Sequence, residues 1–171
     1  MSLTVIVLSD YSINHNKPTP TVRKIMKSCK KRNIPFYGIR LGEAFVVDSD
    51  VFGPELTIHN FDGEGKVINI PKKETVCIAR GGAIAEQSHK ALMQSLQEAG
   101  VFMVNDYDAM ETASNKFATA IKLRKNGIPS PKTSLVTNEQ SIPIALKEVG
   151  NKFPVIIKTI KGSKGIGVMK V

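Results

Sequence analysis

The chain has 171 residues, of which 42% are hydrophobic and 23% are charged, a composition typical of a soluble globular protein. A chain of this length forms one compact domain or two small ones and needs no disulfide to fold. No apolar run approaches the roughly 20 residues that span a bilayer, and no basic segment precedes the apolar run Thr4–Leu8. We therefore expect neither a membrane helix nor a signal peptide. Cys29 and Cys77 lack metal-like spacing, which indicates free thiols in the reducing cytoplasm.

The net charge of +9 predicts an anionic partner such as a nucleotide, a nucleic acid or an acidic polypeptide. One basic cluster falls in a predicted helix and contains Arg23, Lys24, Lys27, Lys30, Lys31 and Arg32. No aromatic residue that could stack on a base lies among these charges, so a solvated helix face is the simpler interpretation. A second cluster is interleaved with glycines and follows the last acidic residue, Glu148; it contains Lys152, Lys158, Lys161, Lys164 and Lys170.

The first 105 residues alternate between β-prone and helical segments. We expect strands at residues 4–8, 36–39, 75–79 and 101–104, with hairpins at the sheet edge between residues 42 and 70. One helix is expected from Pro20, after the N-cap Thr19, and another from beyond Gly82 to about Ala99, before Gly100. This order predicts an α/β domain with a parallel sheet over residues 1–105.

A second unit is predicted over residues 106–171. Its first helix is expected to begin at Asp108, which has capping-box spacing to Glu111, and to end near Gly127. The apolar stripe of this single helix consists of Met110, Ala113, Phe117, Ala120 and Ile121. A strand at residues 132–136, a short helix at about 140–149 and a strand at 155–159 follow. Residues 160–171 are expected to form a glycine-punctuated turn and the start of another strand, and this last strand has no visible partner.

The segment from Lys158 to Val168 carries the main chemical signal. Freedom for positive φ and for close approach to a ligand comes from Gly162, Gly165 and Gly167. Backbone N–H groups of such a loop bind anions, and positive charge suited to a polyphosphate is added by Lys158, Lys161 and Lys164. The glycine order fits neither a Walker A loop nor the dinucleotide-binding fingerprint, and a flexible hairpin tip is the alternative interpretation.

Candidates elsewhere in the chain are fewer. Lys116 lies on the flank of the apolar stripe, where its stem can be buried and its ammonium can extend into a cleft; the alternative is an ordinary surface lysine. Ser9, Asp10 and His15 follow the first strand, at the carboxyl edge of the expected parallel sheet, where ligands gather. We interpret His89 as a structural residue, and the histidines show no metal-site spacing.

Four motifs follow one another in the second unit: Asn115-Lys116-Phe117, Gly127–Thr133, Phe153–Lys158 and Gly162–Val168. Together they resemble the beginning of the ATP-grasp core, in particular that of the RimK-like ribosomal-protein glutamate ligases. The segment Ile78–Ile84 resembles the end of the preceding domain in that family. The resemblance covers residues 76–171, and residues 1–75 match in architecture only. It implies a Rossmann-like pre-ATP-grasp domain at 1–105 and a truncated first ATP-grasp subdomain at 106–171.

The resemblance also implies roles for individual residues. The phosphates of ATP would be bound by Lys116, Lys158, Lys161, Gly162, Ser163, Lys164, Gly165, Ile166 and Gly167. Arg80 and Gly81 would contact a substrate carboxylate. The family joins a carboxylate to an amine through an acyl phosphate made from ATP, and the implied substrates are glutamate and a protein C-terminus.

The family's Mg²⁺ ligands and its adenine-recognising strand would lie beyond Val171, and no carboxylate follows Glu148 to bind the metal. We therefore expect ATP and Mg²⁺ as cofactors of a longer protein, and we expect these 171 residues alone to bind ATP weakly and to lack ligase activity. The alternatives are a non-catalytic basic module for RNA or the ribosome, or a protein scaffold. A homo-oligomer is a further alternative, because an exposed last strand could pair with the same strand of a neighbouring molecule.

Overall fold

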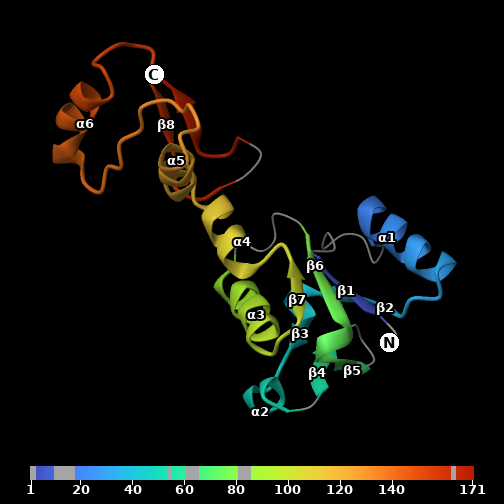
Figure 1. Cartoon of the computed structure of the whole chain (residues 1–171). Coiled ribbons are helices and arrows are strands. Elements are labelled where there is room, and N and C mark those ends of the chain that lie inside the picture. Colours follow the sequence, from blue (N-terminus) through green and yellow to red (C-terminus); the bar gives the residue numbers. More distant parts are fainter. Residues whose placement is uncertain (1–2, 10–17, 54, 61–65, 81–85, 163–164) are drawn as a thin grey trace. The chain divides into compact units, whose positions relative to one another are not determined.

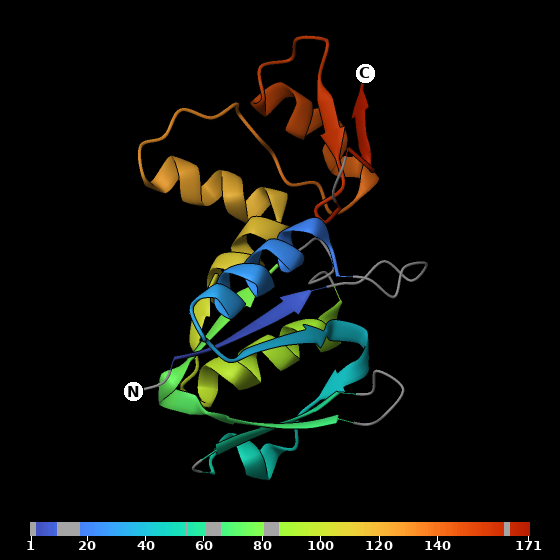
Figure 2. The same cartoon turned by 90° about the vertical axis from the view of Figure 1, so that its right-hand side faces the viewer.

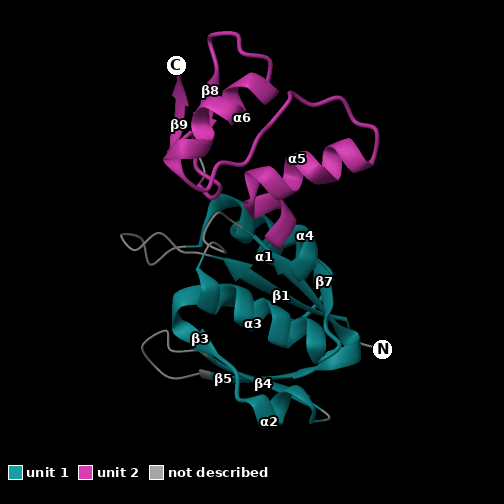
Figure 3. Ribbon diagram, turned by 90° about the vertical axis from the view of Figure 1, so that its left-hand side faces the viewer, with its two compact units in different colours: residues 1–110 teal, residues 111–171 magenta. Residues whose placement is uncertain are grey.

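The computed structural model describes residues 3–9, 18–53, 55–60, 66–80, 86–162 and 165–171. The chain divides into two compact units, residues 1–110 and 111–171, which are coloured separately in Figure 3 and are described one at a time below. The division between the units falls between Met110 and Glu111, a few residues after the boundary at 105/106 that the sequence suggested.

The first unit contains a four-stranded parallel sheet in the order β2-β1-β6-β7 (Figure 1). Its strands are β1 (Thr4–Ser9), β2 (Phe36–Arg40), β6 (Thr75–Ala79) and β7 (Phe102–Val104). All six residues of β1 are buried, as expected for a strand covered on both faces. The predicted α/β class with a parallel sheet is therefore confirmed.

Helices α1 (Pro20–Lys31) and α3 (Gln87–Glu98) pack on opposite faces of this sheet (Figures 2 and 3). The Thr19 hydroxyl caps α1 by accepting from the Val22 N–H, and Pro20 is the first helical residue, as predicted. One core lies under α1 and consists of Val5, Val7, Val22 and Cys29. The larger core lies under α3 and includes Ile6, Leu8, Cys77, Met93 and Leu96.

A small antiparallel sheet forms from the segment predicted to contain hairpins. Its strands are β3 (Ala44–Phe45), β4 (Glu55–Asn60) and β5 (Lys66–Pro71), and a four-residue helix, α2 (Asp48–Val51), lies between β3 and β4. Short 3-10 turns occupy residues 41–43 and 72–74. Leu56, Ile58 and Ile70 are fully buried and join the core under α3, so this sheet is part of the first unit's fold rather than a peripheral excursion.

The second unit is more open. It contains α5 (Lys116–Lys125), a 3-10 turn at Glu139–Ser141, α6 (Ile142–Glu148), and the antiparallel strands β8 (Ile156–Lys158) and β9 (Val168–Lys170). Helix α4 (Tyr107–Ser114) runs across the division between the units. None of the described residues from 111 to 171 is buried, whereas the first unit has two buried cores.

Three expectations for the second unit were wrong. The predicted single helix is two helices, because the Asn115 side chain accepts from the N–H groups of Phe117 and Ala118 and starts a new helix there. The cap of α4 is Asp106, whose Oδ1 accepts from Ala109 N, and not Asp108. The last strand does have a partner, since β9 pairs with β8 from Ile156↔Lys170 to Lys158↔Val168.

The predicted strand at residues 132–136 was also wrong. These residues have no regular secondary structure and are all exposed. The expected helix at 140–149 and the strand at 155–159 are present with slightly narrower bounds. Across the described ranges, no helix combines the length and apolarity needed to cross a membrane.

Candidate functional site

The glycine-rich segment forms the turn of the β8–β9 hairpin. Lys158 pairs with Val168 at the end of the ladder, and the Thr159 N–H donates to the Gly167 carbonyl at 2.8 Å. The backbone φ values of Gly162, Gly165 and Gly167 are 135°, 78° and 70°, which residues other than glycine rarely adopt. The positive-φ backbone predicted for these three glycines is present in the structure.

Thr159 lies inside the turn and organises it. Its hydroxyl donates to the Lys161 carbonyl at 2.6 Å. A Cβ on residue 167 would lie 2.7 Å from Thr159 Cγ2, and a Cβ on residue 162 would lie 3.3 Å from Thr159 Oγ1. Glycine is therefore required at 167 for space as well as for φ. The role of Thr159 could not be predicted from the sequence, because it depends on contacts that no local pattern reports.

Lys116 is joined to this turn from a distant point in the sequence. Its ammonium donates to the carbonyls of Thr159 at 3.0 Å and Gly162 at 3.2 Å, and its backbone N–H donates to the Ile160 carbonyl at 3.0 Å. Lys116 is the first residue of α5, so the Asn115 cap and the glycine turn meet at the same helix end. The structure thus brings Lys116 and Gly162 together.

Six backbone N–H groups of the turn have no partner among the described residues, which is the feature that an anion site needs. Among the described residues, no acceptor is hydrogen-bonded to the N–H groups of Ile160, Lys161, Gly162, Gly165, Ile166 and Gly167. The carbonyls of Thr159, Lys161 and Gly162 instead accept from Lys116 and from the Thr159 hydroxyl. Unpaired N–H groups in a glycine turn form a concavity of positive potential.

The charges of the second unit reinforce this potential. Residues 111–171 contain eleven lysines and arginines against three glutamates, a net charge of +8 out of the +9 of the whole chain. Lys158 lines a hollow of about 330 Å³ together with Ile157, Thr159, Gly167, Val168 and Met169. Lys116 does not line this hollow, although its ammonium is bonded to the carbonyl of the residue that follows Lys158.

The remaining predicted residues lie in different places. Lys161 and Ile166 are exposed in the turn, and the Ile166 side chain is 73% exposed. Ser163 and Lys164 lie outside the described residues, as do Gly81, Asp10 and His15. Arg80 belongs to the first unit, where its backbone N–H donates to the Leu8 carbonyl at 2.9 Å and its side chain is exposed.

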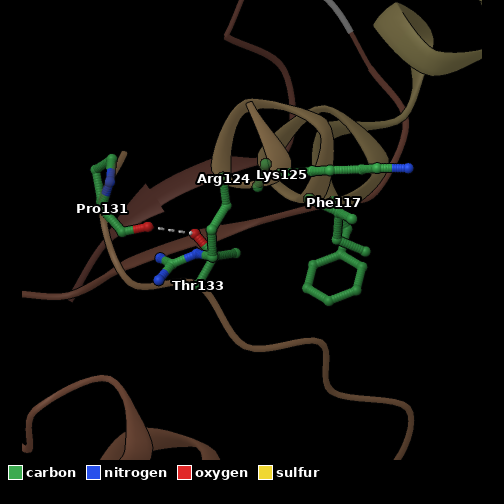
Figure 4. Close-up of a pocket in the computed structure, with 7 residues that line it drawn as sticks. Phe117, Arg124, Lys125, Pro131 and Thr133 are labelled. Atoms are coloured by element: carbon green, nitrogen blue, oxygen red, sulfur yellow. Dashed lines mark hydrogen bonds between the residues drawn. The ribbon is translucent and has the colours of Figure 1, made fainter. Parts of the chain in front are cut away.

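A second hollow, of about 410 Å³, lies along α5 and was not expected from the sequence (Figure 4). It is lined by Phe117, Ala120, Ile121, Arg124, Lys125, Pro131 and Thr133. The Thr133 hydroxyl donates to the Pro131 carbonyl at 3.1 Å and fixes the loop beside the helix. Three residues of the predicted apolar stripe, Phe117, Ala120 and Ile121, therefore line this hollow. Two cationic residues, Arg124 and Lys125, line it as well.

Metal binding has no ligand set in the part of the chain that the structure describes. There, no group of three or more His, Cys, Asp or Glu side chains is arranged to hold an ion. The residues at the glycine turn fit a polyphosphate, since they offer N–H groups and ammonium groups, but they offer no carboxylate to Mg²⁺.

The fold described above is similar to about half of the fold of ATP-grasp ligase structures. A RimK domain ATP-grasp protein from Sphaerobacter thermophilus superposes with a TM-score of 0.66 at 18% identity, over 98% of this chain and 53% of that one. D-alanyl-alanine synthetase A from Vibrio cholerae gives a TM-score of 0.64 at 17% identity, over 100% of this chain and 52% of that one. At these identities the likeness concerns the fold alone.

The sequence likeness is narrower. Residues 113–171 match the RimK-like ATP-grasp domain, so the resemblance to RimK-like ATP-grasp proteins is confirmed for this part of the chain. A probable alpha-L-glutamate ligase from Marinobacter nauticus is 33% identical over 94 residues, which is 55% of this chain and 31% of the relative. One from a Marinomonas species is 29% identical over 137 residues, 77% of this chain and 44% of the relative. The chain spans less than half the length of these relatives.

Proposed function

We propose that this chain supplies the phosphate-binding part of an ATP-dependent carboxylate–amine ligase. The RimK-like match over residues 113–171 and the relatives named as glutamate ligases support the class of reaction. The observation that carries the proposal is the glycine turn, where six N–H groups have no partner in the described part of the chain while the carbonyls of residues 159, 161 and 162 accept from Lys116 and Thr159.

Each residue of the turn has a distinct part in this proposal. The N–H groups of residues 160–162 and 165–167, which have no partner among the described residues, bind phosphate oxygens, and Lys158 and Lys161 neutralise their charge. Lys116 holds the turn at its base and is close enough to it to extend its remaining N–H to a bound phosphate. Ser163 and Lys164 belong to the same segment of the sequence and are proposed as further contacts.

When bound, ATP would supply the phosphoryl group that activates a carboxylate. The protein would keep the polyphosphate oriented and its charge screened as the group is transferred. Among the described residues, no three His, Cys, Asp or Glu side chains are grouped to hold Mg²⁺. Glutamate as the acid and a protein amine or C-terminus as the acceptor are proposed from the relatives, with Arg80 and Gly81 as substrate contacts.

A titration of the 171-residue chain with tripolyphosphate, followed through its backbone amide NMR signals, tests the proposal. The amides of Ile160, Gly162 and Gly167 should shift together, and replacing Lys158 with Ala should weaken binding about tenfold, because one ammonium–phosphate contact is lost. Lys152→Ala is the matched control, since Lys152 is exposed and lies outside the turn. Uniform shifts over all basic surfaces, or equal affinity in both variants, would contradict the proposal.

The second candidate function is that of a basic RNA-binding module, and the exposed basic side chains in and next to helix α1 favour it. The six basic side chains between Arg23 and Arg32 are all exposed, and α1 contains no acidic residue. RNA binding that weakens steeply with salt and that is lost on replacing Lys24 and Lys27 with Gln would support it. Retention of RNA affinity in that double variant would exclude α1 as the binding surface.

A further inference from the structure

The parallel sheet of the first unit has a topological switch point between β1 and β6. From β1 the chain crosses through α1 to β2 on one side, and from β6 it crosses through α3 to β7 on the other. The two helices cover opposite faces of the sheet, as Figures 2 and 3 show. In open parallel sheets, the carboxyl ends of the strands at such a point form the usual place for a ligand.

Three polar side chains share one face of the sheet at this edge. Val5 and Val7 face α1, so by alternation Ser9 does as well. Ser9 is in register with Arg40, which follows Phe36 on the same face, and Arg80 follows Ile78, which also packs in the core under α1. The bond from Arg80 N to the Leu8 carbonyl shows that the ladder continues to Arg80. Ser9 therefore lies between two arginines on neighbouring strands.

Ser9 has an unused hydrogen-bonding group. The residue is only 2% exposed, and its Oγ has no partner among the described residues. A buried hydroxyl without a partner is costly, and such groups in folded proteins are rare. The position of this hydroxyl at the switch point indicates that it has a ligand as its partner.

A second unused group lies beside Arg40. The Arg40 guanidinium donates to Glu43 Oε1 at 2.5 Å, which holds the Glu43 carboxylate at the same edge of the sheet. The other oxygen, Glu43 Oε2, is buried and has no partner in the described part of the chain. A buried carboxylate oxygen requires a donor, and a cationic donor satisfies it best.

From these groups we infer a binding site for the α-amino and carboxylate groups of an amino acid, at the carboxyl edge between β1 and β6. The carboxylate accepts hydrogen bonds from the Ser9 hydroxyl and the Arg80 guanidinium, and the α-ammonium donates to Glu43 Oε2. A simple anion would leave Glu43 without a donor, and a simple amine would leave Ser9 and Arg80 without an acceptor. This inference rests on the proposed ligase function and assigns its amino-acid substrate to named residues of the first unit.

Titration of the 171-residue chain with L-glutamate and with glutarate, followed by isothermal calorimetry, tests the inference. Glutarate has the same two carboxylates as L-glutamate but lacks the α-amino group. L-Glutamate should bind about tenfold more tightly than glutarate, and Glu43→Gln should remove that difference. Arg80→Gln and Ser9→Ala should weaken both ligands. The matched controls Glu55→Gln and Thr57→Ala change an exposed and a half-buried residue of β4, away from the proposed site, and should change neither affinity.

Each outcome bears on the site. Equal affinity for the two ligands in the unaltered chain, or unchanged affinity for L-glutamate in Arg80→Gln, overturns the inference. Arg80 is exposed, so its variant remains informative even if Ser9→Ala fails to fold. Tripolyphosphate binding at the glycine turn, measured on the same sample, separates the two proposals. If it persists without amino-acid binding, the further inference fails and the proposed function stands.

Discussion

Thr159 fills the space above Gly167 that any larger residue at 167 would need. A Cβ on Gly167 would lie 2.7 Å from Thr159 Cγ2, far inside normal contact distance. The hydroxyl of the same threonine donates to the Lys161 carbonyl, and its backbone carbonyl accepts from the Lys116 ammonium. One side chain thus fixes both the narrow neck of the glycine turn and the direction in which its carbonyls point.

Replacing Gly167 with Ala should therefore disrupt the turn. The substitution adds a clash, worth about 1–3 kcal/mol, to the cost of about 1 kcal/mol for a side chain at positive φ. Gly165→Ala is the matched control, because its φ of 78° is similar and nothing lies within 4 Å of its Cβ position. Hydrogen exchange of the Thr159 amide should be faster in Gly167→Ala than in Gly165→Ala. Equal exchange rates in the two variants would show that the contact between Thr159 and residue 167 does not determine the stability of the turn.

Lys116 should stabilise the turn even without a ligand. Lys116→Met keeps an unbranched side chain of similar shape but removes two hydrogen bonds, to Thr159 O and Gly162 O, with an expected local loss of about 1 kcal/mol. Protection of the Thr159 amide should fall, and tripolyphosphate affinity should fall with it. Lys122→Met changes an exposed lysine of the same helix and should leave both unchanged. An equal effect of the two variants would mean that Lys116 acts only through its positive charge and not through its hydrogen bonds to the turn.

The sequence predicted the elements whose signal is local and periodic. Strand β1 and helix α1 follow directly from an apolar run and from the Thr19-Pro20 start. The break at Asn115 could not be seen in this way, because the apolar stripe from Met110 to Ile121 continues across it. The break depends on one side-chain oxygen that accepts two backbone N–H groups.

Long-range contacts account for the other differences. Residues 132–136 have β-prone side chains, but strand propensity is expressed only when a neighbouring strand is available to pair with. The candidate site was predicted as a set of lysines and glycines, and its geometry was not. Lys116 and Thr159 are 43 positions apart, and no pattern in the chain reports that their atoms meet.

Asn115 should be the residue that separates α4 from α5. In Asn115→Ala, the N–H groups of Phe117 and Ala118 lose their acceptor, and the helix start should be destabilised by about 1 kcal/mol. Asn115→Asp retains the accepting oxygen and should behave like the original residue. Amide exchange at Phe117 and Ala118 measures the effect directly. Fast exchange in Asn115→Asp as well would mean that the amide nitrogen, and not the oxygen, is essential.

Cys77 should make stability depend on pH in the alkaline range. Burial raises the pKa of the Cys77 thiol to about 12, against 9.0 for the free group, and a hydrogen bond with the Leu8 backbone opposes the shift only in part. The folded state keeps its proton between these values while the unfolded state loses it, so stability falls as the pH rises above 9.0. Below that pH the thiol is protonated in both states and contributes no pH dependence.

The size of this effect can be isolated from other titrating groups. Between about pH 8 and about pH 10, the free energy of unfolding should fall by about 1.4 kcal/mol more in the original chain than in Cys77→Ala, which has no thiol to titrate. Val7→Ala also removes volume from a fully buried site but titrates nothing, so its cost should be the same at both pH values. Denaturant unfolding at the two pH values gives the comparison. A cost for Cys77→Ala that does not change with pH would mean that the thiolate forms as readily in the folded protein as in the unfolded one.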